Sequence, residues 1–203
     1  MKYTISSPQY DNYQIYASER ECYAIRSTGN LYLRAMVPYR YQAPQSRTGS
    51  FNRDDMDPAY GNLDYLKKPH PKEKLTCDRA AIIYFEGSGF MGVENFNGYP
   101  TFTDIVRENI VFICCDYRGA GLDDERFPCN IEDAKEAIRY VRKNAARFGI
   151  DENRIFVMGC SSGGYTATMA GITSEDEFIY GDNKDISNKV AGIIDCFGTH
   201  RFR

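Results

Sequence analysis

The chain has 203 residues, of which 42% are hydrophobic and 26% are charged, which is an ordinary composition for one domain with a sizeable core. Its formal net charge of -3 gives no electrostatic basis for binding nucleic acid or an anionic membrane. No apolar run approaches the roughly 20 residues that a membrane helix needs, and the first eight residues lack the apolar segment of a signal peptide. We therefore expect a cytoplasmic protein that binds neither nucleic acid nor membrane.

Seven cysteines occur, an odd number, and none of them form a C-x-x-C pair. We interpret them as reduced, buried thiols of a cytosolic protein. Cys114 and Cys115 are neighbours on an expected strand, so their side chains should point to opposite faces of the sheet. No His or Cys cluster has the spacing of a metal site, so we expect neither a metal nor a cofactor.

The first 40 residues are rich in tyrosine and favour β structure, and we expect antiparallel strands there. Residues 31–37 give the clearest of these strands, which Pro38 should end. Residues 40–78 are polar and contain four prolines, Pro44, Pro58, Pro69 and Pro71. This stretch predicts a long surface excursion, and such loops are often functional or mobile.

From Arg79 onward, strands and helices alternate along the chain. Near-continuous apolar runs predict strands at residues 80–85, 110–115, 155–158 and 190–197. Helices are expected at residues 99–108 and 130–148 and from residue 163. The order predicts a single α/β domain over residues 1–203, with a mostly parallel sheet, right-handed crossovers and helices on both faces.

The helix at residues 130–148 has the clearest boundary signals. Asn130 can cap its first turn, with Asp133 three residues later as a variant of the capping box. Apolar residues recur at helical spacing from Ile131 to Phe148, and Gly149 should end the helix.

The segment Gly159-Cys160-Ser161-Ser162-Gly163 stands between an apolar strand and a run of small residues that starts a helix. A strand, a G-x-S-x-G turn and a helix together describe a nucleophile elbow. The turn is so tight that the residues flanking the serine must be small, and it lifts the Ser161 hydroxyl clear of the sheet. The pattern predicts Ser161 as a nucleophile.

A serine hydroxyl is a weak nucleophile, so it needs a base within hydrogen-bond reach and backbone N–H donors for the oxyanion that forms. The N–H of Ser162 is one natural donor. A second set is expected in the loop at residues 86–90, directly after the first buried strand, because its glycines let the backbone turn N–H groups toward a substrate.

At this point the chain resembles the α/β-hydrolase superfamily, in particular the esterase and lipase branch with feruloyl-esterase-like and carboxylesterase-like members. The resemblance covers roughly residues 79–198. Its motifs are YFEGSGF at 84–90, DYR at 116–118, FPxxIED at 127–133, NAARFGID at 144–151 and RIFVMGCSSGG at 154–164. The elbow alone is a weak motif, whereas these segments in this order are together specific.

The resemblance implies that Ser161 is the nucleophile and that the N–H groups of Gly87, Ser88 and Ser162 form the oxyanion hole. Two departures stand in the glycine loop, where Glu86 replaces the usual His and Ser88 replaces the middle glycine. The donors are backbone groups, so the hole could survive. A carboxylate near a developing oxyanion is unfavourable unless it points away or is protonated.

In this family the triad acid and base follow strands beyond the last one expected here, so the resemblance implies an α/β-hydrolase domain that is incomplete at its C-terminus. Order in the fold argues against His70 and His200 as the base. We expect Asp195 to have a turn-capping or core-edge role, and Asp116 with Arg118 to form a structural ion pair.

An incomplete sheet would leave an edge, and Val190, Ile193 and Ile194 on the last strand should then be exposed, which invites self-association.

The sequence therefore predicts a serine-dependent hydrolase of small carboxylic esters that acts through an acyl-enzyme on Ser161, with the acid and base of the triad missing from this chain. On its own the chain should be inactive or very weak. The alternative is a non-catalytic α/β-hydrolase-like protein that serves in binding or interaction. An acyltransferase or peptidase on the same fold stays open, because nothing in the chain reports on the acyl acceptor.

Overall fold

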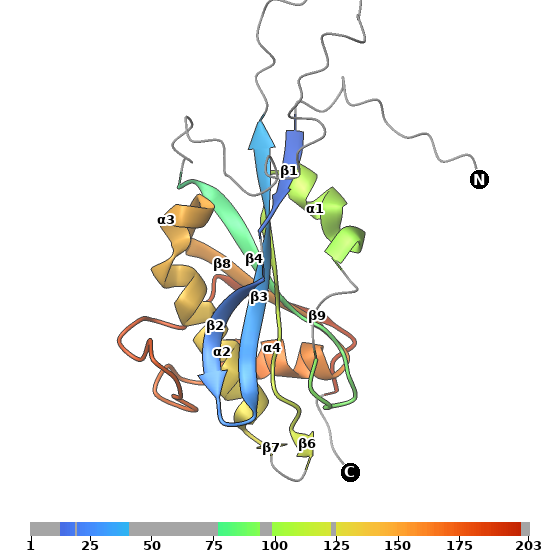
Figure 1. The fold of residues 1–203 in the computed structure, drawn as a ribbon, viewed down its shortest axis with the longest axis vertical. Helices are drawn as coiled ribbons and strands as arrows, with labels where there is room; N and C mark the ends of the chain where they lie inside the picture. The colour runs from blue at the N-terminus through green and yellow to red at the C-terminus, as the bar shows by residue number, and fades with distance from the viewer. Residues whose placement is uncertain (1–12, 19, 41–76, 94–98, 123–124, 200–203) are drawn as a thin grey trace, which may run out of the picture.

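The computed structural model describes residues 13–18, 20–40, 77–93, 99–122 and 125–199 (Figure 1). Its strands are β1 (Tyr13–Ala17), β2 (Glu21–Arg26), β3 (Gly29–Arg40), β4 (Arg79–Phe85), β5 (Val111–Cys115), β6 (Gly121–Leu122), β7 (Glu125–Arg126), β8 (Ile150–Cys160) and β9 (Gly192–Cys196). Its helices are the 3-10 turn η4 (Tyr99–Phe102), α1 (Thr103–Arg107), α2 (Cys129–Lys143), α3 (Ala145–Phe148) and α4 (Ser162–Ile172).

The main sheet is mixed, in the order β1-β3-β5-β4-β8-β9, with β2 paired to β3. Strand β4 pairs parallel with β5 and β8, and β8 pairs parallel with β9. Strand β3 pairs antiparallel with β1, β2 and β5. All five residues of β5 are buried, which is why its sequence is a continuous apolar run rather than an alternating one. The predicted α/β class, with a mostly parallel sheet and antiparallel N-terminal strands, is confirmed.

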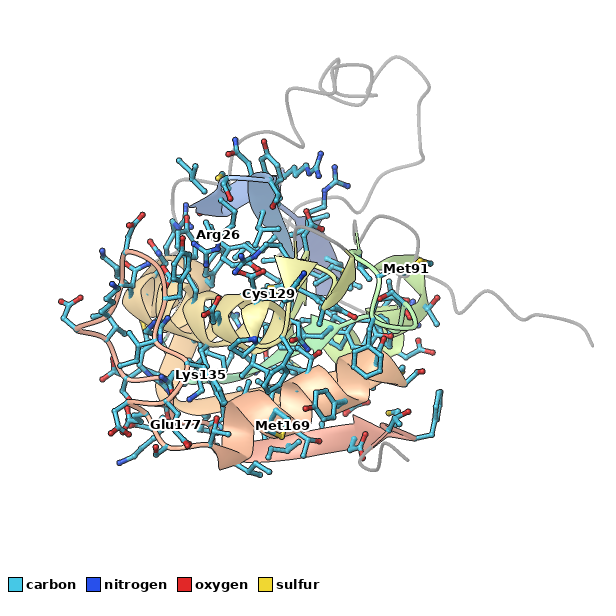
Figure 2. The ribbon with its side chains drawn as sticks, turned by 90° about the horizontal axis from the view of Figure 1, so that it is seen from below. Arg26, Met91, Cys129, Lys135, Met169 and Glu177 are labelled. Atoms are coloured by element: carbon cyan, nitrogen blue, oxygen red, sulfur yellow. The ribbon has the colours of Figure 1, made fainter. Side chains whose placement is uncertain are left out.

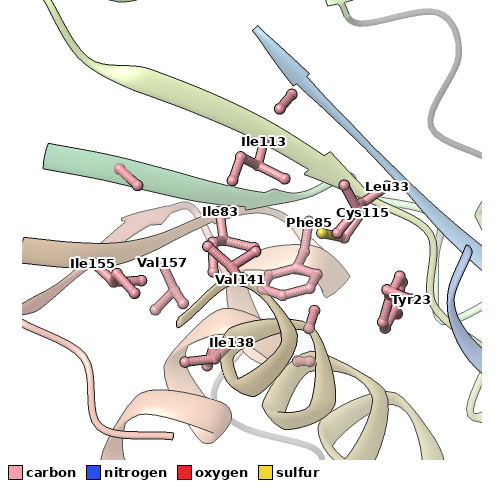
Figure 3. Close-up of a cluster of buried hydrophobic side chains, with 14 of the residues drawn as sticks. Tyr23, Leu33, Ile83, Phe85, Ile113, Cys115, Ile138, Val141, Ile155 and Val157 are labelled. Carbon is pink, nitrogen blue, oxygen red and sulfur yellow. The ribbon is translucent and has the colours of Figure 1, made fainter. Parts of the chain in front are cut away.

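Helices cover both faces of the sheet, with α1 on one side and α2, α3 and α4 on the other (Figure 1). The larger core lies under α2, where Ile138 and Val141 pack toward Ile83, Phe85 and Val157 (Figure 3). The smaller core contains Val106 of α1. Cys115 belongs to the larger core and Cys114 to the smaller one, so the prediction that these neighbours face opposite sides is confirmed.

Among the boundaries that differ from the prediction are the end of β3 and both ends of α2. Strand β3 continues through Pro38 to Arg40. Beyond Met36 it has left β5 and pairs only with β1, so a residue without an N–H is tolerated there. Helix α2 begins at Cys129 after an N-cap at Pro128. Asn130 is buried and donates from Nδ2 to Thr166 Oγ1 of α4 at 2.8 Å, so it makes a tertiary contact instead of capping the helix.

The far end of α2 also differs from the prediction, because the helix ends at Lys143. Asn144 Nδ2 donates to the Tyr140 carbonyl at 2.9 Å, a side-chain bond that competes with the backbone ladder. The chain then forms the separate turn α3, which ends at Gly149 with φ 68, so the predicted stop at this glycine is confirmed.

A buried ion network joins the N-terminal hairpin to α2. Arg118 Nε donates to Asp133 Oδ2 at 2.9 Å, so Arg118 pairs with Asp133 rather than with Asp116 as predicted. Asp133 also accepts from Arg26 Nε at 2.8 Å. Asp116 lies 3.3 Å from Arg20 Nη2. Asp116 thus forms an ion pair as predicted, but with Arg20. Asp133, which was predicted as part of a capping box, pairs with Arg26 and Arg118 instead.

The long connection between α4 and β9 is held against α2 by charged side chains. Lys135 Nζ donates to the carbonyls of Ser174 at 2.6 Å and Glu177 at 2.8 Å, and Figure 2 shows Lys135 beside this segment. Arg139 Nη2 donates to the carbonyl of Tyr180 at 2.7 Å. These bonds satisfy backbone oxygens that the connection cannot pair by itself.

The predicted apolar edge is only partly exposed. In the described part of the chain, β9 pairs with β8 and ends the sheet order. Ile194 is 38% exposed, whereas Val190 and Ile193 are partly buried and pack against the larger core. Their predicted exposure is wrong, because α4 covers that side of the strand.

All seven cysteines are free thiols. Cys22 and Cys77 are exposed, which corrects the expectation that the thiols are buried throughout. Within the described ranges, no helix is long and apolar enough to span a bilayer. The predicted polar excursion falls on residues 41–76, which lie outside the described residues.

Candidate active site

Ser161 stands at the junction between β8 and α4, so the predicted turn between a strand and a helix is present. Its backbone has φ 51 and ψ -122, which is a strained conformation for a residue with a side chain. Its N–H donates to the carbonyl of Cys196 at 3.0 Å, and its carbonyl accepts from Tyr165 N at 3.1 Å. The Ser161 side chain is half-buried at the end of the sheet.

The turn requires glycine beside the serine for a measurable reason. A Cβ at Gly159 would stand 2.7 Å from the amide nitrogen of Gly164, and one at Gly163 would stand 2.6 Å from the carbonyl oxygen of Glu86. Real Cβ atoms essentially never approach other atoms this closely. The two glycines of G-x-S-x-G therefore let α4 start directly against the strand ends.

The glycine loop that follows β4 lies against this turn. A Cβ at Gly87 would stand 2.8 Å from the carbonyl oxygen of Cys160 and 3.0 Å from Ser161 Cβ. Ser88 N donates to Ser162 Oγ at 2.8 Å. The structure thus brings the four predicted site residues, Ser161, Gly87, Ser88 and Ser162, into one place.

Two of the predicted oxyanion donors have acceptors within the chain. Gly87 N donates to Glu86 Oε1 at 3.2 Å, and Ser88 N donates to the Ser162 hydroxyl. Ser162 is the first residue of α4, and a helix provides no acceptor for the N–H of its first residue. That the three N–H groups serve one substrate oxygen stays a prediction.

Tyr117 is a site residue that our sequence reasoning missed as such. Its hydroxyl donates to the carbonyl of Glu86 and lies 3.4 Å from Ser88 Oγ. Burial raises the pKa of Tyr117, and hydrogen bonds with Ser88 and Ser162 act in the opposite direction. The DYR motif contained this residue, but only the fold shows that it joins the glycine loop to the start of α4.

The described ranges contain no histidine that could act as the base for Ser161. His70 and His200 lie outside the described residues. Asp195 Oδ1 accepts from Gly198 N at 2.8 Å, so the predicted turn-capping bond is present. No group of three or more His, Cys, Asp or Glu side chains in the described part of the chain could hold a metal ion.

A protein-family model matches most of the chain, including these site residues. The BD-FAE family model matches residues 66–203. The chain belongs to the BD-FAE family.

Three named proteins have sequences similar to about half of this chain. Esterase LipC of Mycobacterium tuberculosis is 34% identical over 106 residues, which cover 52% of this chain and 26% of LipC. Carboxylesterase NlhH of the same organism is 34% identical over 95 residues, which cover 44% of this chain and 28% of NlhH. Arylacetamide deacetylase-like 2 of Homo sapiens is 33% identical over 103 residues, covering 48% of this chain and 25% of the relative. The chain thus spans about a quarter of the length of these relatives.

Among solved structures, the thermophilic esterase Est2 of Thermogutta terrifontis superposes with a TM-score of 0.64 at 22% sequence identity. The match covers 89% of this chain and 53% of that esterase. This match shows the fold. Together with the family model and the similar esterases, it confirms the resemblance to the esterase branch of the α/β hydrolases.

Proposed function

We propose that this chain carries the nucleophile of a serine-dependent carboxylic ester hydrolase, in which Ser161 forms an acyl-enzyme with a small ester. The observation that supports this most is the strained Ser161 between β8 and α4, with the glycine loop packed against it. Strain at a residue of this kind persists where the surrounding structure enforces it, and it clusters at active sites.

In this proposal the N–H groups of Gly87, Ser88 and Ser162 bind the oxyanion. For Gly87 the Glu86 carboxylate must first give up its hydrogen bond. The Ser88 N–H donates to the Ser162 hydroxyl, so it can also bind the substrate oxygen only if the two oxygens share it. The hole is therefore filled by the chain's own side chains until a substrate arrives.

We also propose that these 203 residues do not supply the acid and the base of the triad. Serine hydrolases that lose a triad member keep only about 10³–10⁴-fold catalysis over water, from the oxyanion hole and binding. A base added from solution should then restore part of the lost rate, because the Ser161 proton needs only an acceptor within reach.

The test is p-nitrophenyl acetate hydrolysis by the purified chain with and without imidazole, followed by mass mapping of the acetyl group. We expect acetylation of Ser161 that imidazole accelerates and that Ser161→Ala abolishes. Ser174→Ala, which changes an exposed serine outside the site, is the matched control. Turnover that needs no imidazole and disappears in His200→Ala would show instead that the chain contains its own base.

A non-catalytic binding or interaction protein is the second candidate, and the Glu86 contact favours it. A carboxylate on the Gly87 N–H opposes an oxyanion at the same place. If imidazole gives no Ser161-dependent acetylation in either the native chain or Glu86→Gln, this second function replaces the first.

We further propose that the chain works in the reducing cytoplasm and self-associates through the β9 edge. The seven free thiols support the first point. The exposed Ile194 on the last strand of the described sheet supports the second. Sedimentation of the native chain should show oligomers that Ile194→Lys disperses, and a monomer at every concentration would contradict this proposal.

A further inference from the structure

Two cysteines lie side by side at the strand ends next to the strained Ser161. Cys160 is the last residue of β8 and Cys196 is the last residue of β9. The parallel pairing of these strands places them directly opposite each other in register. Register partners in neighbouring strands have side chains on the same face of the sheet.

The separation of such partners suits a disulfide. Neighbouring strands lie about 4.8 Å apart, and the Cα atoms of bonded cysteines are usually about 4.4–6.8 Å apart. Both thiols are half-buried, which distinguishes them from the fully buried Cys114 and Cys115. The Tyr84 hydroxyl donates to Cys160 Sγ at 3.4 Å and holds that sulfur at the end of β8.

The electrostatics of the pair agrees with this geometry. Burial raises the pKa of Cys196, and the charge of Cys160 and a hydrogen bond with it raise it further. The Cys196 thiol therefore interacts directly with Cys160, through this hydrogen bond and through charge. No other two of the seven cysteines are register partners on adjacent strands among the described residues.

We propose that Cys160 and Cys196 form an oxidisable dithiol site whose substrate is hydrogen peroxide. The Cys160 thiolate attacks one peroxide oxygen, the O–O bond breaks, and Cys160 sulfenic acid and water form. The sulfur of Cys196 then displaces the sulfenic oxygen as a second water, and the S–S bond forms. The two thiols lose two protons and two electrons in total, and hydrogen peroxide accepts them. Cys160 attacks first because its sulfur accepts a hydrogen bond from the Tyr84 hydroxyl, which favours negative charge there, whereas burial raises the pKa of Cys196.

The bridge would close around the nucleophile turn. The N–H of Ser161 donates to the carbonyl of Cys196, and Cys160 directly precedes Ser161 in the chain. Both residues that would be linked therefore lie next to that hydrogen bond. Oxidation would join the ends of β8 and β9 covalently and fix the backbone from which Ser161 projects. This site does not depend on the proposed hydrolase function, because its chemistry uses neither the Ser161 hydroxyl nor the glycine loop.

The test is to treat the reduced chain with hydrogen peroxide at low protein concentration and to measure its intact mass and its non-reduced peptide map. We expect a loss of about 2 Da, for the two hydrogens of a disulfide, a peptide that links residues 160 and 196, and reversal by dithiothreitol. The linked peptide is read from the native chain, so the result does not depend on any variant folding.

Matched variants refine the result. Cys160→Ser and Cys196→Ser should each abolish the linked peptide, whereas Cys22→Ser and Ser161→Ala should leave it unchanged. The proposal is overturned if the mass does not fall, if the linkage maps to other cysteines, or if Cys160 and Cys196 gain oxygen without becoming linked.

Discussion

Replacing Gly163 with alanine should destabilise the fold far more than the same change at Gly171 of the same helix, α4. An ideal Cβ at this position would stand 2.6 Å from the carbonyl oxygen of Glu86 and 2.7 Å from the carbonyl carbon of Phe85. These are backbone atoms at the end of β4, so they cannot rotate away, and either the strand end or the helix must shift. Overpacking of this kind costs about 1–3 kcal/mol and sometimes more.

Gly171 in the same helix is the matched control. A Cβ there would stand 2.7 Å from Ile193 Cδ1 and Cγ1, which are side-chain atoms that can move more readily than the backbone atoms facing Gly163. Alanine also gains roughly 1 kcal/mol of helix propensity over glycine. Gly171→Ala should therefore be nearly neutral, and we expect the two variants to differ by about 2–3 kcal/mol.

For a chain of this size, that difference corresponds to a gap of roughly 4–12 °C between the two melting temperatures. Thermal unfolding followed by circular dichroism measures it directly. If Gly163→Ala melts within a degree or two of Gly171→Ala, the glycine loop does not press against the start of α4 as described, and the geometry behind the proposed oxyanion hole fails with it.

Three further outcomes are expected. Tyr117→Phe removes the hydroxyl that bonds the carbonyl of Glu86, so hydrogen exchange should accelerate in the loop at 86–91 while α2 keeps its protection; equal protection in both proteins would contradict this role. Lys135→Met removes the donor to two carbonyls of the connection after α4, so limited proteolysis there should become faster. Lys189→Met removes only a surface ion pair with Glu175, from a side chain that is 78% exposed, so it should change proteolysis much less. Burial first, and then the hydrogen bond to a carboxylate, raise the pKa of Tyr140 from 10.0 to about 12. Neutral Tyr140 is therefore favoured in the folded state, and its contribution to stability, complete below pH 10, should be lost as the pH rises toward 12; a Tyr140→Phe variant with the same alkaline decline would refute that assignment.

The parts of the fold that sequence predicted are those that local composition determines. The buried strands β4 and β5 are continuous apolar runs, and such runs leave little choice but a sheet covered on both faces. The turn at Ser161 was predictable because only small residues fit there, and the sequence places Gly159 and Gly163 on either side.

The parts that sequence did not predict depend on tertiary partners. Asn130 has the ideal chemistry of a helix cap, yet it points to Thr166 on a helix that begins more than thirty residues later. Arg118 stands two residues from Asp116 but bonds to Asp133, because α2 carries that carboxylate beneath the loop after β5. In both cases local chemistry allowed two partners, and packing chose the more distant one.

The same reasoning separates what holds Ser161 from what would activate it. A strained residue persists only when its surroundings over-determine it. Here the N–H of Ser161 is bonded to the end of β9, its carbonyl to the second turn of α4, and its neighbour Ser162 to the glycine loop. Each contact comes from a different element of the described sheet and helix layer, and none of them involves a general base. The shape of the turn is therefore fixed by these hydrogen bonds and by the close packing around its glycines, whereas the reactivity of the Ser161 hydroxyl depends on a proton acceptor. This is why added imidazole and Ser161→Ala, rather than a stability measurement, decide whether the turn is a working nucleophile.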